Sequence, residues 1–181
     1  MPIIYDELVE RCQKGDVYCY AELYKKYSRA MYNTSMRIVN NRNDAEDILQ
    51  EAFTDAFKYL DDFNFNSPFG AWLKKIVINK SISLLRKRKM WIDIDNTNVT
   101  ELPEEEVIDE SMILLKVETI KKCMQLLNNG YRTILSLYLF EGYDHEEISK
   151  ILHIPSATVR SQYMRARQKL LNLIKKENDY V

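Results

Sequence analysis

The sequence has little glycine and little proline, with four residues of each among 181. Few positions can therefore form the tight turns that short strands need, and few interrupt a helix. Alternating apolar and polar runs are also scarce, whereas apolar residues recur at helical spacing over long stretches. These features predict an all-α fold, and the length permits one domain or two small ones.

Cysteine and histidine are scarce as well. The three cysteines (Cys12, Cys19 and Cys123) are odd in number and form no C-x-x-C motif, and the two histidines complete no metal-ligand spacing. The composition therefore predicts a reduced, cytoplasmic protein without metal or cofactor, in which the cysteines are small core residues.

Long apolar runs and catalytic motifs are missing too. No apolar run approaches the length of a membrane span, and the first residues, MPIIYDELVE, lack the core of a signal peptide. The sequence has no glycine-rich phosphate loop and no Ser-His-Asp or Cys-His arrangement with supporting context. We therefore expect neither membrane insertion nor enzymatic activity.

The net charge of −1 conceals a segregation of charge along the chain. Residues 71–90 contain seven basic and no acidic residues, whereas residues 91–115 contain eight acidic and no basic residues. Residues 156–176 again contain six basic and no acidic residues. The neutral total therefore does not argue against nucleic-acid binding, which depends on where positive charge gathers.

Residues 144–170 have the pattern of two helices joined by a three-residue turn. Asp144 and Glu147 have the spacing of a capping box at the start of the first helix. Pro155 ends that helix, and His153 occupies a turn position that needs a left-handed backbone. The buried face of the first helix would consist of Ile148, Ile151 and Leu152.

Ser156 is the expected N-cap of the second helix, whose buried stripe would be Val159, Tyr163, Ala166 and Leu170. The opposite face has small residues at its tip and arginines beyond, which suits insertion into a DNA major groove. That face consists of Ala157, Thr158, Arg160, Ser161, Met164, Arg165 and Gln168, and the predicted DNA contacts are its first six residues together with Ser156. The pattern favours a DNA-binding helix-turn-helix, although an ordinary helical hairpin with a basic solvent face has the same spacing.

Residues 44–60 form a strongly amphipathic pattern, and Asn43, directly before it, has capping-box spacing with Glu46. Its apolar positions are Ala45, Ile48, Leu49, Ala52, Phe53, Ala56, Phe57 and Leu60. The other face is acidic and includes Asp47, Gln50 and Glu51. The spacing alone indicates no more than a solvated acidic face.

Residues 61–67 form a loop rich in aromatics and asparagines, with Phe63, Asn64 and Asn66 among them. A helix capped by Ser67 and reaching about Met90 should follow, with Trp72, Leu73, Ile76, Ile82 and Leu85 buried. Its other face carries Lys75, Asn79, Lys80, Ser83, Arg86 and Lys87. Aromatics stack on unpaired bases, amides read base edges and cations neutralise phosphates, so these parts suit single-stranded DNA.

The remaining segments complete the predicted helices. Residues 3–14 should form a short helix that ends at Gly15, and Asp16 should cap a long helix to about Val39. That long helix would bury Tyr20, Leu23, Tyr24, Tyr27, Met31 and Ile38. Residues 91–110 are polar and acidic, as in a linker. Another helix from about residue 111 would bury Ile113, Val117, Ile120, Met124 and Leu127, end at Asn129-Gly130, and be followed by a helix over 131–140.

Three stretches carry a family resemblance. EEISKILHIPSATVRSQYMRARQKL resembles the promoter-reading helix-turn-helix of bacterial sigma factors, with His153 where the family usually has glycine. DAEDILQEAF resembles sigma region 2.2, and FGAWLKKIVINKSISLLRKRK resembles regions 2.3 and 2.4, with Ser83 where many members have aspartate. The resemblance spans about residues 17–170. It identifies the chain as a member of the extracytoplasmic-function (ECF) sigma factors.

The resemblance implies a role for each predicted surface. Asp47, Gln50 and Glu51 would bind the beta-prime clamp helices of core RNA polymerase. The loop and the polar face of the following helix would open and read the promoter −10 element, and residues 156–165 would read the −35 element. The implied domains are region 2 (residues 1–90), an acidic linker (91–110) and region 4 (111–181).

The resemblance also implies partners. They are core RNA polymerase, including its beta flap, together with promoter DNA and an anti-sigma factor. The helix-turn-helix by itself also resembles the LuxR-type regulators, which bind duplex DNA without melting it. A LuxR-like regulator is therefore the alternative, although its partner domain would show alternating strands and helices that residues 44–90 lack.

Overall fold

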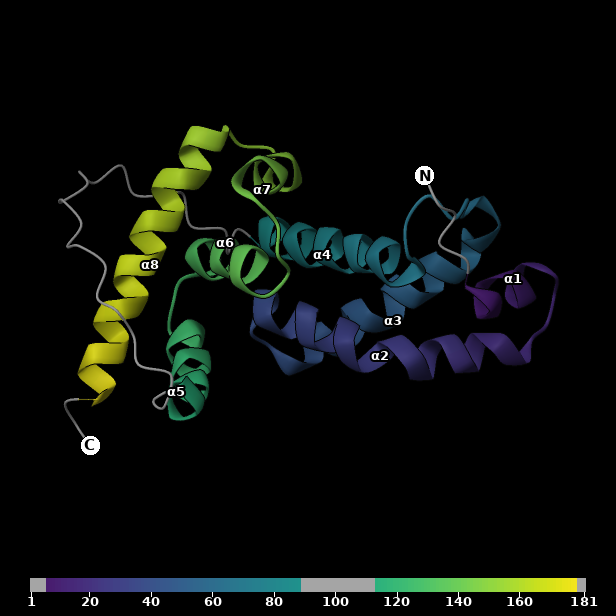
Figure 1. Ribbon diagram of the computed structural model, residues 1–181, viewed down its shortest axis with the longest axis horizontal. Helices are drawn as coiled ribbons and strands as arrows, with labels where there is room; N and C mark the ends of the chain where they lie inside the picture. The colour runs from purple at the N-terminus through teal and green to yellow at the C-terminus, as the bar shows by residue number, and fades with distance from the viewer. Residues whose placement is uncertain (1–5, 89–112, 179–181) are drawn as a thin grey trace. The chain divides into compact units, whose positions relative to one another are not determined.

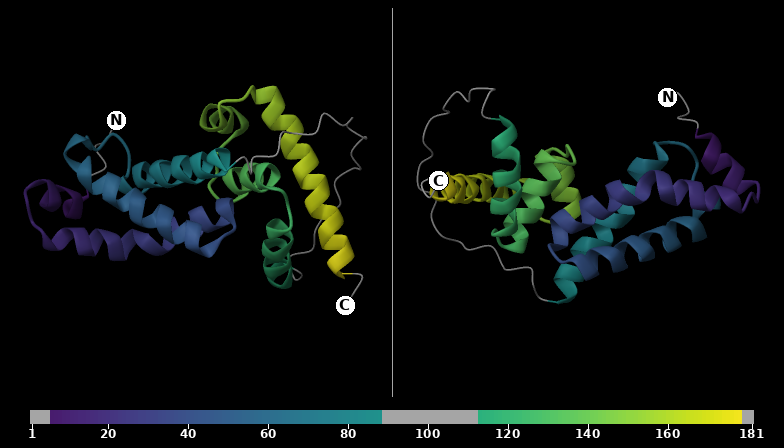
Figure 2. Two further views of the ribbon diagram at one scale, coloured as in Figure 1. Left: turned by 180° about the vertical axis from the view of Figure 1, so that it is seen from behind. Right: turned by 90° about the horizontal axis from the view of Figure 1, so that it is seen from below.

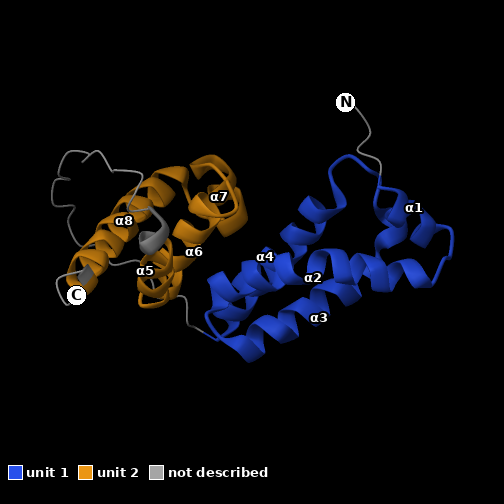
Figure 3. Ribbon diagram, turned by 60° about the horizontal axis from the view of Figure 1, so that its bottom comes forward, with its two compact units in different colours: residues 1–88 blue, residues 89–181 orange. Residues whose placement is uncertain are grey.

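The computed structural model describes residues 6–88 and 113–178, except for the side chains of residues 113–116 and Asn178. Within these ranges the regular structure is entirely helical, which confirms the predicted all-α fold. The chain forms two compact units, residues 1–88 and 89–181 (Figure 3). The predicted acidic linker at residues 91–110 lies outside the described residues.

The first unit contains α1 (Glu7–Gln13), α2 (Tyr18–Val39), α3 (Arg42–Lys58), the short 3-10 helix η1 (Leu60–Asp62) and α4 (Phe69–Lys87). Helices α2, α3 and α4 pack side by side, and α1 packs against α2 and η1 (Figures 1 and 2). The predicted apolar stripe of α3 is confirmed from Ala45 to Ala56, while Phe57 is half-buried. Burial of these stripes against one another is what holds the three helices together.

Helix α2 uses its tyrosines differently from the prediction. Leu23, Met31 and Ile38 are buried as expected. Tyr24 is 41% exposed, and its ring lies 4.7 Å from that of Phe53. The phenol oxygen keeps such a ring at the surface, because a buried hydroxyl needs a hydrogen-bond partner. Tyrosine at helical spacing therefore marks the edge of this core rather than its centre.

The turn between α2 and α3 is tighter than predicted. Asn40 adopts a left-handed conformation (φ 53°) and ends α2, so Asn41 is already extended and becomes the N-cap of α3. Its Oδ1 accepts a hydrogen bond from the Asp44 amide at 3.1 Å. The prediction of Asn43 as the cap, paired with Glu46, was wrong, because Glu46 bonds to Arg42 instead.

The starts of the other helices also differ from the predictions. Asp16 is not the N-cap of α2, since Val17 holds that position, although the Asp16 carboxylate accepts from the Tyr18 amide at 3.0 Å. Pro68, not Ser67, is the N-cap of α4. Its carbonyl accepts from the amides of Ala71 and Trp72. Proline suits this position because it has no N–H to satisfy there.

The first helix is shorter than predicted. Asp6 is extended and caps α1 by accepting from the Leu8 amide, so Asp6 is not helical; residues 3–5 lie outside the described residues. Gly15 follows α1 with φ 90°, which confirms the predicted stop. Along α4, Leu73, Ile82 and Leu85 are buried as predicted, whereas Trp72 and Ile76 are half-buried.

Cys12 and Cys19 form a disulfide bond with their Cα atoms 5.6 Å apart. The prediction of fully reduced cysteines was therefore wrong for this pair, while Cys123 is a free thiol. All three cysteines are buried, as expected. The spacing of seven residues hid the pairing, because only the turn at Gly15 brings α1 and α2 together.

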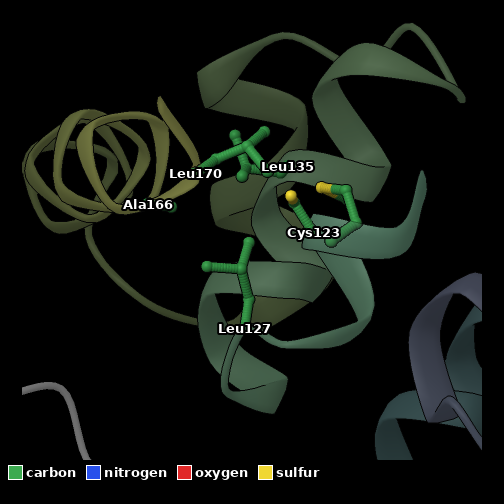
Figure 4. Packing of buried hydrophobic residues seen from close by; sticks show 6 residues of the cluster. Cys123, Leu127, Leu135, Ala166 and Leu170 are labelled. Atoms are coloured by element: carbon green, nitrogen blue, oxygen red, sulfur yellow. The ribbon is translucent and has the colours of Figure 1, made fainter. Parts of the chain in front are cut away.

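The second unit contains α5 (Ile113–Gln125), α6 (Asn129–Leu139), α7 (His145–Leu152) and α8 (Ser156–Asn178). Its centre is an apolar cluster contributed by α5, the turn after it, α6 and α8 (Figure 4). The buried members are Cys123, Met124, Leu127, Leu135, Ala166 and Leu170. Burial of Met124 and Leu127 was predicted, but Val117 is 38% exposed and that prediction was wrong.

The break between α5 and α6 comes earlier than predicted. Asn128 is the N-cap of α6 and accepts from the Tyr131 amide, so Asn129 and Gly130 lie inside α6 rather than ending α5. Arg132 supports this turn from within the core, at 4% exposure. Its guanidinium donates to the Leu127 carbonyl at 2.8 Å and to Asn129 Oδ1. Burial lowers the pKa of Arg132 to about 10.

No helix in the described part of the chain is long and apolar enough to cross a bilayer.

Candidate nucleic-acid interface

The turn between α7 and α8 has the local geometry that its sequence predicts. The Asp144 carboxylate accepts from the Glu147 amide at 2.8 Å, and Glu147 accepts from the Asp144 amide at 2.9 Å. The predicted capping box is therefore confirmed. His153 is left-handed (φ 50°), as expected for this position. Ser149 Oγ donates to the Ile154 carbonyl at 2.6 Å and closes the turn.

Helix α8 begins one residue earlier than its predicted cap implies. The first intrahelical hydrogen bond runs from the Val159 amide to the Pro155 carbonyl, so Ser156 is already helical. The N-cap position therefore belongs to Pro155, and the predicted Ser156 cap was wrong. The difference is one residue, and it leaves the direction of the helix tip unchanged.

The buried side of α8 holds the two helices in register. Val159, Ala166 and Leu170 are buried as predicted. Gln162 is 1% exposed, which the stripe did not predict. Tyr163 is only half-buried. Its ring lies 4.5 Å from Tyr138 of α6 and 5.1 Å from His145 of α7, so an aromatic cluster joins three helices.

The predicted reading face of α8 divides into exposed and half-buried positions. Ala157 and Arg160 are exposed. The half-buried positions are Ser156, Thr158, Ser161, Met164 and Arg165. Arg160 pairs with Glu146 of α7 at 3.0 Å, and both side chains are more than half exposed. Such a surface pair contributes little to the stability of the fold.

The acidic face of α3 is open to solvent. Asp47, Gln50 and Glu51 are all exposed, on the side of the helix opposite its buried stripe. Glu51 also reaches toward α4, where its carboxylate lies 3.2 Å from Lys80 Nζ. Asp55 is the second partner of Lys80, at 2.7 Å.

Helices α3 and α4 thereby form one open groove of about 450 Å³ that carries both signs of charge. Its lining residues are Asp44, Asp47, Ile48 and Glu51 from α3, and Asn79, Lys80, Ser83, Leu84, Lys87 and Arg88 from α4. The acidic face of α3 and the polar face of α4, which the sequence analysis assigned to different partners, are therefore neighbours. The sequence also missed the ion pair between Arg88 and Asp44, at 2.5 Å, because it joins residues 44 positions apart.

Lys80 differs from the other predicted cations of α4. Its hydrogen bond with Asp55, followed by that with Glu51, raises the pKa of Lys80. The ammonium group is therefore charged but already paired within the protein. Lys75, Asn79, Ser83, Arg86 and Lys87 are exposed along the same helix.

The loop before α4 separates its aromatic and amide residues. Phe63 is 6% exposed, and its ring lies 5.2 Å from that of Trp72 and 5.8 Å from that of Phe69. This ring supports the loop from inside and presents no open face for stacking. Asn64 and Asn66, by contrast, are exposed. The structure thus places the two amides, but not Phe63, on the surface.

The fold and its surfaces define a class of protein: a two-unit helical protein with a helical bundle and a helix-turn-helix of the DNA-binding type. The family model of Sigma-70 region 2 matches residues 23–90, and the family model of Sigma-70 region 4 matches residues 118–170. The chain belongs to the sigma-70 family, in its ECF group. The region 2 match is the reason a LuxR-like regulator is not favoured.

Individual relatives match most of the chain. RNA polymerase sigma-H factor of Pseudomonas aeruginosa is 33% identical over 172 residues, which cover 90% of this chain and 89% of that protein. ECF RNA polymerase sigma factor SigW of Bacillus subtilis is 29% identical over 180 residues, which cover 94% of this chain and 96% of that protein. Among solved structures, sigma factor RpoE in complex with anti-sigma factor NepR from Bartonella quintana has the same fold, with a TM-score of 0.57 at 24% identity. That match covers 88% of this chain and 98% of the other.

Proposed function

We propose that this protein binds core RNA polymerase in the bacterial cytoplasm and directs it to promoters, where it reads a −35 and a −10 element. The observation that supports this most directly is the combination, in one chain, of a region 2 bundle with a charged groove and a helix-turn-helix with an exposed tip. The relatives named above are similar to this chain over most of their length, including the segments that match both regions.

In this proposal each surface has one partner. Asp47, Gln50 and Glu51 bind the polymerase clamp, since they are exposed and no apolar packing depends on them. The tip of α8 enters the major groove of the −35 duplex, where Arg160 exchanges Glu146 for DNA. The residues assigned to the unpaired −10 strand are Asn64, Asn66, Lys75, Asn79, Lys80, Ser83, Arg86 and Lys87.

The rest of the proposal concerns regulation and chemistry. An anti-sigma factor is the proposed inhibitor, because the solved structure of sigma factor RpoE, which has this fold, is a complex with the anti-sigma factor NepR. The protein itself performs no reaction. Hydrogen bonds to base edges and neutralisation of phosphates are sufficient for its work, and the polymerase carries the catalytic site.

The test is reconstitution of the full chain with core RNA polymerase. We expect a stable complex, discrete transcription starts on genomic fragments, and permanganate-reactive thymines near position −10 of those promoters. Core polymerase alone is the control and should give none of the three. A chain that binds duplex DNA but neither associates with core polymerase nor changes its start sites would contradict the proposal.

A further inference from the structure

Helix α1 is attached firmly to α2 at both of its ends. At its start, Asp6 Oδ2 accepts hydrogen bonds from Tyr27 Oη at 3.1 Å and from Lys26 Nζ at 3.2 Å. Near its end, the Cys12–Cys19 disulfide joins the two helices covalently. A helix of seven residues has little stability of its own, so these attachments hold it in place.

The last residue of α1 reaches a distant part of the chain. Gln13 Nε2 donates to the Leu60 carbonyl at 2.8 Å and to the Phe63 carbonyl at 3.0 Å. These carbonyls lie at the two ends of the turn formed by η1, and both amide hydrogens of Gln13 are used. The contacts span 47 and 50 residues of sequence, so α1 fixes the backbone from which the loop at residues 63–67 departs.

The loop beyond Phe63 depends on that fixed base. The Phe63 ring is packed inside the unit, so its backbone can shift only if the ring does. Phe65 adopts a left-handed conformation (φ 57°), which is unfavourable for an aromatic residue and must be held by its surroundings. The Asn66 amide donates to Asn64 Oδ1 at 3.3 Å. Together these contacts constrain the backbone of the loop that carries the two exposed asparagines.

We infer that Gln13 is a positioning residue for promoter opening: it holds the Leu60 and Phe63 carbonyls and thereby orients Asn64 and Asn66 toward the unpaired −10 strand. This inference rests on the proposed function, since it takes the loop to be the part that contacts that strand. Gln13 itself touches no DNA. It acts through the backbone of the loop.

The experiment uses the full chain with core polymerase on a duplex promoter, with permanganate reactivity of the −10 thymines as the readout. Gln13→Ala should slow opening about fivefold, the effect expected for losing one to two hydrogen bonds of ordinary strength. Binding of the closed complex should be unchanged. Lys14→Ala is the matched control, because Lys14 follows Gln13 directly and its exposed side chain pairs with Glu10 instead of with the loop.

Two further variants separate positioning from general stability. Gln13→Lys keeps a donor for the carbonyls and should restore much of the opening rate, whereas Gln13→Glu places a carboxylate against them and should not. In a double-mutant cycle with Asn64→Ala plus Asn66→Ala, Gln13→Ala should add little, since both changes act on one loop. Additive effects, or equal defects in the Lys and Glu variants, would overturn the inference.

The cycle also distinguishes this inference from the function on which it rests. If the asparagine variant opens the promoter normally, the proposed role of the loop is wrong and the inference falls with it. If the asparagine variant is defective and Gln13→Ala behaves like the unmodified protein, only the role of Gln13 is wrong.

Discussion

The two units organise their polar groups in different ways. In the first unit the described buried polar residues are Thr34, Ser35 and Ser81, all small hydroxyl residues, and its charges meet at the surface between α3 and α4. In the second unit the core holds a guanidinium and an amide, Arg132 and Gln162. The first unit therefore depends on apolar packing for stability and uses charge for contacts. The second unit adds a buried guanidinium that hydrogen-bonds to the turn between α5 and α6, beside the apolar cluster that packs against α8.

This difference has a consequence for mutation. A charge change in the groove of the first unit should alter binding while the bundle stays folded, because surface ion pairs contribute little to stability. A change at a buried polar group of the second unit should destabilise that unit and leave the stability of the first unchanged. The following predictions test this contrast.

The largest effect should come from reversing charge on α3. Asp47→Lys with Glu51→Lys should weaken core-polymerase binding by about a hundredfold or more, because like charges at an interface cost several kcal/mol. The measurement is competition for core polymerase against the unmodified protein. Asp61→Lys is the control, since this exposed residue of η1 lies outside the groove. If the variant competes for core polymerase as strongly as the unmodified protein, the acidic face is a solvated surface and not a polymerase-binding site.

Next in size is Arg132→Ala in the second unit. The change removes the donors to the Leu127 carbonyl and Asn129 and leaves a cavity, so the free energy of unfolding of that unit should fall by about 3 kcal/mol. Urea denaturation followed by circular dichroism should show one transition shifted and the other unchanged. A shift of both transitions together would show that the units are coupled.

The reading helix should give a smaller effect, confined to DNA. Arg160→Ala with Arg165→Ala should weaken binding to a −35 duplex by about thirtyfold and reduce the salt dependence. Glu146→Gln is the informative companion, because it releases Arg160 without removing it. That variant should bind at least as tightly as the unmodified protein. Unchanged affinity and salt slope in the arginine variant would exclude this face from the interface.

The Cys12–Cys19 disulfide should stabilise only the first unit. Its short loop predicts a contribution of about 2 kcal/mol to the free energy of unfolding, largely through restriction of the unfolded chain. Oxidised and reduced protein can be compared by denaturation. Cys12→Ser with Cys19→Ser is the control and should show no response to a reductant. A response in that variant would assign the effect elsewhere.

The smallest effect concerns Lys80. Its ion pairs raise its pKa in the folded state, so the stability they contribute is present below the unfolded-state pKa of about 10.4 and is lost as pH rises through the folded-state value. Since the Glu51 and Asp55 side chains are 65% and 44% exposed, the contribution should be at most about 1 kcal/mol. In Lys80→Gln the free energy of unfolding should fall less steeply as pH rises above about 10, whereas Lys75→Gln should keep the pH dependence of the unmodified protein.

Local features of this chain were predictable because they depend on residues a few positions apart. The capping box of Asp144 and Glu147, the left-handed His153 and the buried stripe of α3 all follow from such short-range rules. So does the all-helical fold, given the few glycines and prolines. The predicted helix starts were less accurate, because neighbouring residues compete for one N-cap position. The observed N-caps Asn41, Pro68 and Pro155 all differ from the predicted ones.

Contacts between distant residues were decided by tertiary structure. Three such contacts join segments far apart in sequence. Lys80 pairs with Asp55 and Glu51, Gln13 bonds to the base of the loop, and Phe63 is buried. Periodicity shows which side of a helix is apolar, but not which helix will cover it or which charge will face it. Tertiary packing determines which helices meet. Here it brings the acidic face of α3 beside the basic face of α4, and the two faces form one groove.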